Sequence, residues 1–315
     1  MGRLAGAASS LGLALLLSAC GGGGGAGSPS APGGVPAPGA GARIAGCQVF
    51  PADNAWNRDV SGDAVDPRSG AYIASIGARS FLHPDFGSDP SYGLPWTTVP
   101  GSQPRVPMSF DYADESDPGP YPFPRDAPIE AGGDRHVLVL DRDACRLYES
   151  FDSHYVGPGW RCGSGAVFDL GSNALRPDGW TSADAAGLPI LPGLVRLEEA
   201  RSGEIRHALR FTARRTQRAY VHPATHFASD SSDPDLPPMG LRVRLKASFD
   251  ATRFHGASRV VLEALRRYGM LLADNGGDWF ISGETNPAWD DADLDQLKSV
   301  PGSAFEVVKL GEILH

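Results

Sequence analysis

The 315-residue chain lacks the short motifs that identify the commonest enzyme classes. It has no G-x-S-x-G nucleophile elbow, no H-E-x-x-H zinc motif, no P-loop, and no G-x-G-x-x-G that follows a predicted strand. The nearest approach to an elbow is around Ser164, where Cys162 stands in place of the first glycine. The functional argument therefore rests on less specific patterns.

Cysteine is scarce: the chain has only Cys20, Cys47, Cys145 and Cys162. No pair has the C-x-x-C spacing of a metal site, so no metal site is predicted. If Cys20 is lipidated, as argued below, an oxidising compartment allows one disulfide and leaves one thiol. A Cys145–Cys162 bridge would join adjacent strands, whereas Cys47–Cys145 would pin the N-terminal segment to the body. The spacing leaves both open.

Positive charge is also in short supply, with 28 Lys and Arg against 37 Asp and Glu and a formal net charge of −9. An acidic protein has no general attraction for nucleic acid or anionic lipid, so neither is expected as a partner, apart from membrane contact through a lipid anchor. The acidic turns 114–119 and 229–235 would suit calcium but lack EF-hand spacing. No cofactor is therefore expected.

Residues 1–19 have the proportions of a signal peptide, because their apolar run is too short and too rich in glycine to span a bilayer permanently. Residues 17–20, LSAC, resemble a bacterial lipobox, which implies cleavage before Cys20 and acylation of that residue. The alternative is an ordinary signal peptide cut nearby. Because Gly21 rather than aspartate follows, the outer membrane or the cell surface is the expected location.

Three regions follow from this reading of the N-terminus: the signal peptide 1–19, a lipidated cysteine with its tether 20–43, and a body 44–315. The tether is almost wholly Gly, Ala, Pro and Ser, and such a composition cannot form a core. The body is long enough for a substantial core, and we expect it to be a single globular β-rich domain.

The body is predicted to be mainly β: a sandwich or barrel of short antiparallel strands, with long Pro/Gly loops and one or two C-terminal helices. An apolar stripe that stops at Gly269 predicts a helix over 256–269, and a second is expected over 290–300. The turn at 275–277, between two apolar runs, predicts a hairpin. Alternating or β-branched runs predict strands at 135–141, 145–151, 203–213, 218–222 and 239–250.

Basic and apolar side chains alternate in two of these strands. Arg206 and Arg210 share one side of the first strand, and Arg242 and Arg244 share one side of the second. If the strands are neighbours, these arginines form a solvent-facing surface that could bind an acidic polysaccharide; the alternative is a solvated face paired with glutamates. His207 lies on the apolar side and is expected to be a satisfied core histidine.

Paired carboxylates are the usual machinery of glycoside hydrolysis. Asp178 and Asp184 lie in a long loop rich in Gly and Pro, with Trp180 between them as a candidate sugar platform. Asp274 and Asp278 form a second such pair. The alternative is that the loop caps the core and that its aspartates only form turns.

His222 and His226 are four residues apart, a spacing that would bind a metal ion on a helix. Pro223 prevents one regular helix through both, and in a strand they would be about 13 Å apart. We therefore expect a strand that ends at Pro223 with both histidines in polar loop positions. The functional alternative is His226 acting by itself as acid or base, in a lyase together with Tyr220 and an arginine.

Taken together, six segments resemble a widespread family of secreted bacterial proteins, some of them lipoproteins. The segments are 49–67, LHPDFGS (82–88), 164–196, IRHALRFT (205–212), 237–250 and RRYGMLLADNGGDWFISG (266–283). The resemblance covers nearly all of 47–309 but carries no established activity and transfers no catalytic residue. It implies a Cys47–Cys145 disulfide. It also implies that an aromatic often replaces His222, which leaves His226 as the stronger histidine.

Three functions are compatible with these patterns: an enzyme that acts on cell-envelope or environmental polysaccharide, a non-catalytic glycan-binding lipoprotein, and an envelope structural or assembly protein. We favour the enzyme, either a hydrolase or a lyase. Its catalytic candidates are His226, Asp178, Asp184 and Tyr220, and its substrate-binding candidates are Trp180, Arg206, Arg210, Arg242 and Arg244.

Overall fold

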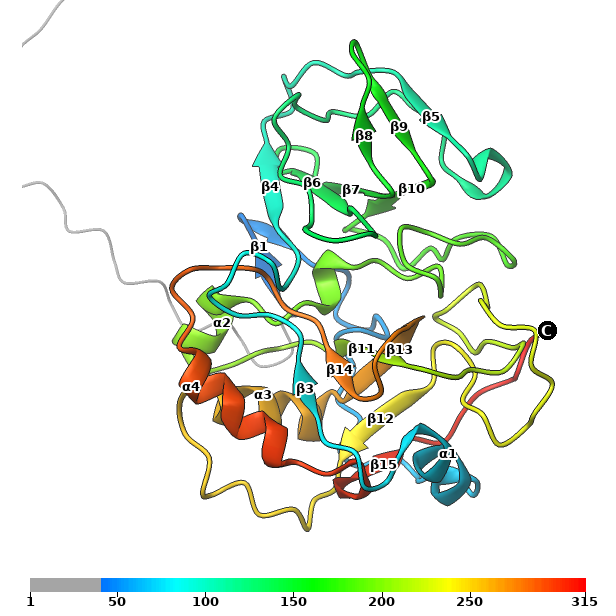
Figure 1. Cartoon of the computed structure of the whole chain (residues 1–315), viewed down its shortest axis with the longest axis vertical. Coiled ribbons are helices and arrows are strands. Elements are labelled where there is room, and N and C mark those ends of the chain that lie inside the picture. The colour runs from blue at the N-terminus through cyan, green and yellow to red at the C-terminus, as the bar shows by residue number, and fades with distance from the viewer. Residues whose placement is uncertain (1–40) are drawn as a thin grey trace, which may run out of the picture. The chain divides into compact units, whose positions relative to one another are not determined.

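Strands form most of the regular structure in the part of the chain that the computed structural model describes, residues 41–315 (Figure 1). The predicted signal peptide, Cys20 and most of the predicted tether lie outside the described residues. The described residues belong to one compact unit. The helices among them are not long and apolar enough to cross a membrane.

Four sheets organise this unit. The largest has six strands in the order β15 (Phe305–Val307), β12 (Arg242–Leu245), β13 (Met270–Asn275), β11 (Leu209–Ala213), β14 (Phe280–Ile281) and β3 (His83–Pro84). The second has β10 (Ser164–Asp169), β7 (Arg146–Phe151), β6 (Val137–Asp141) and β4 (Trp96–Val99). The third has β5 (Met108–Phe110), β9 (Trp160–Cys162) and β8 (His154–Tyr155), and a small ribbon pairs β1 (Arg43–Ile44) with β2 (Cys47–Gln48).

The mainly β, sandwich-like fold is confirmed, and the strands predicted at 135–141 and 145–151 form as β6 and β7, which pair antiparallel. The three larger sheets are mixed rather than purely antiparallel. Their parallel pairs are β11 with β13, β14 with β3, β4 with β6, and β5 with β9. Parallel neighbours arise because long connections return the chain to a sheet beside a strand made much earlier.

The predicted hairpin at 275–277 is wrong, because β11 lies between the two strands that the turn joins. Strand β13 pairs parallel with β11, and β14 pairs antiparallel with the opposite edge of β11. The turn crosses over β11 closely: a Cβ on Gly276 would lie 2.8 Å from Thr212 Oγ1. Glycine is needed there for the close approach of two chain segments.

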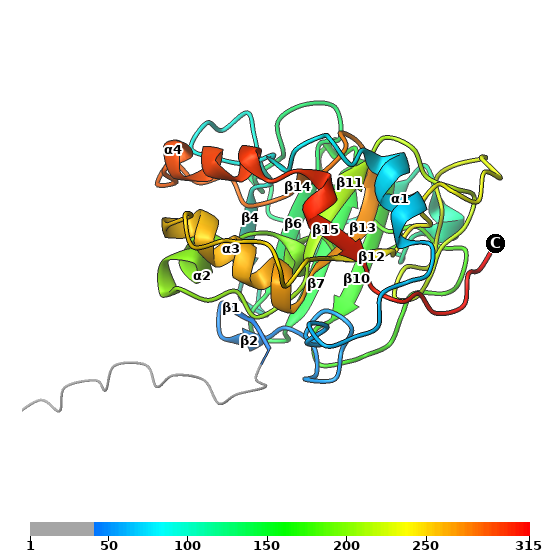
Figure 2. The same cartoon turned by 90° about the horizontal axis from the view of Figure 1, so that it is seen from below.

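The two C-terminal helices are confirmed as α3 (Gly256–Arg267) and as α4 (Asp291–Leu294), which continues into a 3-10 helix, Asp295–Ser299. Helix α3 packs against β12, and both α2 (Leu197–Ser202) and α4 pack against α3 (Figure 2). Helix α1 (Ser69–Ile76), which the sequence did not indicate, packs against β15.

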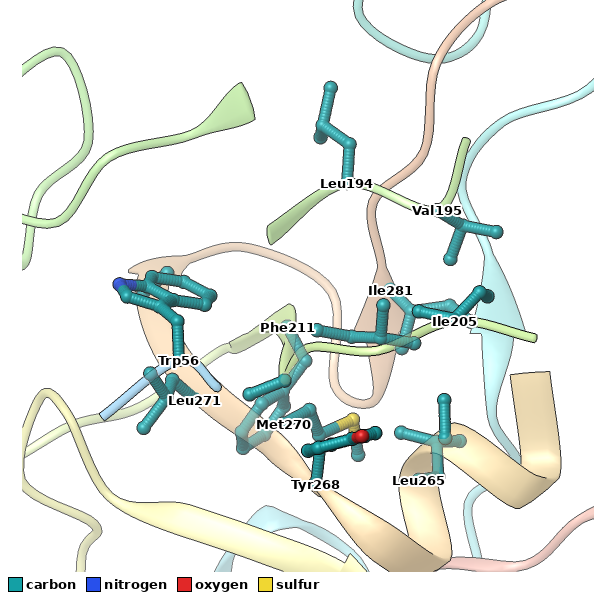
Figure 3. Close-up of a cluster of buried hydrophobic side chains, with 14 of the residues drawn as sticks. Trp56, Leu194, Val195, Ile205, Phe211, Leu265, Tyr268, Met270, Leu271 and Ile281 are labelled. Carbon is teal, nitrogen blue, oxygen red and sulfur yellow. The ribbon is translucent and has the colours of Figure 1, made fainter. Parts of the chain in front are cut away.

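The four-stranded sheet has a hydrophobic core on each face. In β6, Leu138 and Leu140 belong to the large core, whereas Val137 and Val139 belong to a smaller core with Trp160 of the three-stranded sheet. This double burial explains why β6 is apolar throughout instead of alternating. On one face of the six-stranded sheet, Phe211, Met270 and Ile281 lie with Leu265 of α3, whereas Trp56, which comes much earlier in the chain, lies beside Leu271 (Figure 3).

A Cys47–Cys145 disulfide joins β2 to the turn between β6 and β7, as the family resemblance implied. Cys162 is a buried free thiol. A disulfide across 98 residues indicates a protein made for an oxidising, extracytoplasmic compartment.

Candidate active site

A polar pocket of about 320 Å³ lies on one face of the six-stranded sheet, beside the segments that lead into β4 and β6. It concentrates carboxylates, an arginine and a histidine around one hollow, the usual setting of an active site. Its walls are Asp85, Ser91, Tyr92, Gly93, Leu94, Glu130, Ala131, Asp134, His136, Arg210, Thr212, Asp274, Asn275, Gly276, Gly277, Phe280 and Ser282.

Strand register explains why these side chains meet. Thr212 of β11 is opposite Phe280 of β14, which in turn is opposite His83 of β3. Side chains two residues apart share a face, so Ser282, Asp85 and Arg210 form the next row of that face. The row extends beyond the assigned strands, because Asp85 N–H still donates to Ile281 O and Ser282 N–H to Arg210 O.

A β-bulge brings Asp274 into the same face. Strand β13 pairs Phe211 with Leu272 but Thr212 with Asp274, so one residue of β13, Ala273, is skipped. Without the bulge, Ala273 would stand beside Thr212 and Asp274 would point to the opposite face. Bulges commonly re-aim side chains in this way next to active sites.

Arg210 is the cation at the centre of the pocket wall, and it is only 5% exposed. Its Nη2 and Nε donate to the two oxygens of Asp184, at 2.7 and 3.0 Å, and its Nη1 donates to Ser282 Oγ at 2.5 Å. Burial disfavours the charged guanidinium, but the Asp184 carboxylate more than offsets this and raises the pKa of Arg210. The pair is a fixed, neutralised dipole and not a free cation.

His136 is held in place by both ring nitrogens. Its Nε2 donates to Ala183 O at 2.9 Å, and its Nδ1 lies 2.5 Å from Glu130 Oε2. Burial disfavours the imidazolium, but the hydrogen bond and negative charge of Glu130 dominate and raise the pKa of His136 to about 8. His136 therefore carries a positive charge at neutral pH and positions the pocket wall, with no ring nitrogen left over for substrate.

Two carboxyl groups of the pocket have raised pKa values. Burial, reinforced by the negative charge of Asp184, raises the pKa of Asp274 to about 7. Burial also raises the pKa of Asp85, while the positive charge of Arg210 opposes this rise. Asp274 thus keeps a proton near neutral pH, as a general acid must.

A further carboxyl group, Glu149 on β7, supports the loop that carries Asp184. Its oxygens accept the backbone N–H groups of Ile190 and Leu191, and the side chain is fully buried. Burial raises the pKa of Glu149 to about 7 despite these hydrogen bonds. Glu149 does not line the pocket and has a structural role.

The predicted pair Asp178 and Asp184 is separated. Asp184 is 1% exposed and paired with Arg210 behind the pocket, whereas Asp178 is exposed and accepts from His222 Nε2 at 2.8 Å. Asp178 also bonds the Tyr220 hydroxyl. The hydrogen bond from His222 lowers the pKa of Asp178, while burial and the Asp178 charge raise that of Tyr220.

The two histidines of the 218–230 segment have different partners. His226 Nδ1 donates to Ala185 O at 2.7 Å, and its Nε2 lies 3.8 Å from Glu115. His222 precedes Pro223 and bonds Asp178, as described above. No cluster of three or more metal-ligating residues occurs in the described part of the chain, and neither histidine lines the polar pocket.

Trp180 is also outside the polar pocket. The guanidinium of Arg176 lies 5.5 Å from the centre of its ring, so one aromatic face is already covered. Asp278 accepts the backbone N–H of Arg214 and is a turn residue.

His207 is the satisfied core histidine that was predicted, with Arg196, Glu199 and Ala208 O as partners.

The predicted cationic surface is wrong, because Arg210, Arg242 and Arg244 are buried. Arg242 donates to Ala55 O, and Arg244 donates to Val60 O and to Glu306. The N-terminal segment covers the side of β12 that alternation assigned to solvent. Burial, with some repulsion from Arg58, lowers the pKa of Arg242 to about 10, so it stays charged at neutral pH.

Arg206, the fourth arginine of the predicted surface, is partly exposed and pairs with Glu204 at 2.7 Å.

The pocket residues that sequence analysis missed are Asp85, Glu130 and His136. None of the three belongs to a motif or spacing that distinguishes it from the polar residues around it. Comparison of the chain with protein-family models, curated proteins and solved structures finds no match.

Proposed function

We propose that the protein hydrolyses neutral polysaccharide of the cell envelope or of the environment, in the polar pocket. The observation that carries the proposal is the raised pKa of Asp274, about 7, in a pocket that also contains Asp85. Glycosidases use such a pair: one carboxyl group that stays protonated near neutral pH and one carboxylate.

The pKa of about 7 assigns the role of acid to Asp274 and leaves that of carboxylate to Asp85. Asp274 donates its proton to the leaving glycosidic oxygen while the bond from that oxygen to the anomeric carbon breaks. On the attacking side, the Asp85 carboxylate accepts a proton from a water molecule while the oxygen of that water bonds to the anomeric carbon, which leaves a hydroxyl there. Arg210 and His136 hold the pocket wall and favour the ionised form of nearby carboxylates.

Hydrolysis is a better match than a lyase reaction on acidic glycans. A lyase must neutralise the uronate carboxylate before it removes the neighbouring proton. Arg210, the one Lys or Arg that lines the polar pocket, is already paired with Asp184, and the protonated His136 is paired with Glu130. The remaining carboxylates would repel an anionic substrate.

For location, we propose that the lipobox-like residues 17–20 direct cleavage and acylation at Cys20, so that the tether places the enzyme at the outer membrane or cell surface. Cys20→Ser should move the protein from the membrane fraction to the soluble fraction and abolish labelling by a fatty-acid analogue. Unchanged membrane association of Cys20→Ser would reject the anchor.

The test of the activity is incubation of the full chain with a panel of neutral and acidic polysaccharides, followed by assay of reducing ends and of unsaturated-uronate absorbance. We expect new reducing ends from a neutral glycan, without unsaturated product, and a loss of about 10²–10⁴-fold in Asp274→Asn and Asp85→Asn. Asp278→Asn, outside the pocket, is the matched control. Glycan binding without cleavage would favour the binding lipoprotein instead.

A further inference from the structure

A second pocket, here called the side pocket, adjoins the polar pocket. It has a volume of about 360 Å³ and includes His83, Tyr92 and Lys298 among its walls. Tyr92 lines both pockets, and 53% of its surface is exposed. Neither Asp85 nor Asp274 lines the side pocket, so it is separate from the proposed catalytic groups.

Strand β3 connects the two pockets. His83 lines the side pocket and Asp85 lines the polar pocket, and the two residues share one face of the strand about 7 Å apart. Phe280, a wall of the polar pocket, stacks on the His83 ring with centroids 4.0 Å apart and planes 20° apart. The stacked rings of His83 and Phe280 therefore stand between the two pockets, and Tyr92 lines both of them.

We propose that the side pocket binds the sugar units next to the one that is cleaved, so that the substrate is a glycan chain of several units and Tyr92 determines this preference. This inference rests on the proposed function. Flat aromatic faces pack against the apolar faces of sugar rings, while polar side chains bond their hydroxyls. Burial, with the charge of Lys298, lowers the pKa of His83, so its neutral ring can both donate and accept.

The test uses the full chain with neutral oligosaccharides of two to six units taken from the polysaccharide that the panel identifies, or from all neutral members if none is cleaved. Affinity is measured by calorimetry and KM by reducing-end release. We expect affinity to rise and KM to fall as the oligosaccharide becomes longer. In Tyr92→Ala, the ratio of the affinities for the longest and the shortest oligosaccharide should be about tenfold smaller than in the unmodified protein. Tyr92→Phe should retain the gain, because it keeps the ring.

Tyr112→Ala is the control, because Tyr112 is 58% exposed and lines neither pocket. Cleavage without any dependence on chain length, or an unchanged length dependence in Tyr92→Ala, overturns this inference and leaves the proposed function intact. Length-dependent binding that Tyr92→Ala weakens, without cleavage, overturns the proposed function and leaves the side pocket as a glycan-binding pocket only. If the protein neither binds nor cleaves these glycans, both the side-pocket inference and the proposed function are overturned.

Discussion

At the scale of single residues, the pocket works through differences in environment between chemically similar groups. Asp184 and Asp274 are both aspartates close to Arg210. Asp184 accepts two of the three side-chain hydrogen bonds that Arg210 donates. Asp274 accepts none of them, and burial, reinforced by the negative charge of Asp184, raises its pKa to about 7.

This division predicts the high-pH side of the activity profile. Since Asp274 must be protonated to act as the acid, kcat/KM on the neutral glycan should fall tenfold per pH unit above about 7. The measurement is kcat/KM between pH 5 and 9. Activity that stays flat to pH 9 would remove Asp274 from the role of acid.

His136 makes a separate prediction, about stability. Its pKa rises from 6.5 to about 8 on folding, so its pair with Glu130 contributes about 2 kcal/mol below pH 6.5, and this is lost as the pH rises through 8. His136→Gln should therefore lower the free energy of unfolding in urea more at pH 6 than at pH 9.

The control for His136→Gln is His154→Gln, because His154 also pairs with an aspartate but its side chain is 41% exposed. We expect a change below about 1 kcal/mol at either pH for this exposed pair. Equal destabilisation of His136→Gln at pH 6 and pH 9 would contradict a charged His136.

At the scale of elements, sequence periodicity predicted β6, β7 and α3 well but assigned the wrong surroundings to β12. Alternation shows that Val243 and Arg244 point to opposite faces; it does not show what covers each face. The N-terminal segment covers the arginine face through Ala55 O and Val60 O, a contact between residues about 185 apart in sequence that no local pattern encodes.

Burial of β12 on both sides predicts a large effect for Arg244→Ala. The substitution leaves Val60 O and Glu306 without their donor, so we expect a loss of about 3–5 kcal/mol in the free energy of unfolding. Arg161→Ala, which removes an exposed ion pair with Asp111, should cost less than about 1 kcal/mol. Similar small losses in both variants would show that Arg244 is solvated.

The candidate site was less predictable than the fold for a related reason. Asp274 and Asp184 were noted as candidates, but each was paired with the wrong partner along the chain. Their true neighbours, Arg210, His136 and Asp85, come from other strands, and the bulge in β13 decides which face Asp274 takes. A one-residue shift in register of this kind leaves no mark in hydrophobic periodicity.

At the scale of the whole molecule, the Cys47–Cys145 disulfide ties the N-terminal segment to the four-stranded sheet. This segment also covers β12, so the disulfide secures a layer that the large core needs. Closing a loop of 98 residues should stabilise the protein by about 4–5 kcal/mol. We expect dithiothreitol to lower the Tm markedly, and Cys47→Ser/Cys145→Ser to have a low Tm that the reductant does not change.

A Tm that is insensitive to reductant in the unmodified protein would contradict this role of the disulfide. The buried Cys162 is a useful internal comparison, because its burial raises the pKa of the thiol and makes it slow to react. Cys162→Ala should keep the full response of the Tm to dithiothreitol.

The most direct test of the account is the pKa of Asp274 itself. The carboxyl ¹³C signal of Asp274 can be assigned by its disappearance in Asp274→Asn and then followed from pH 4 to pH 9. We predict a midpoint near 7, set by burial and by the charge of Asp184. A midpoint near 4 would contradict the account, because the pocket would then have no acid to protonate a leaving group.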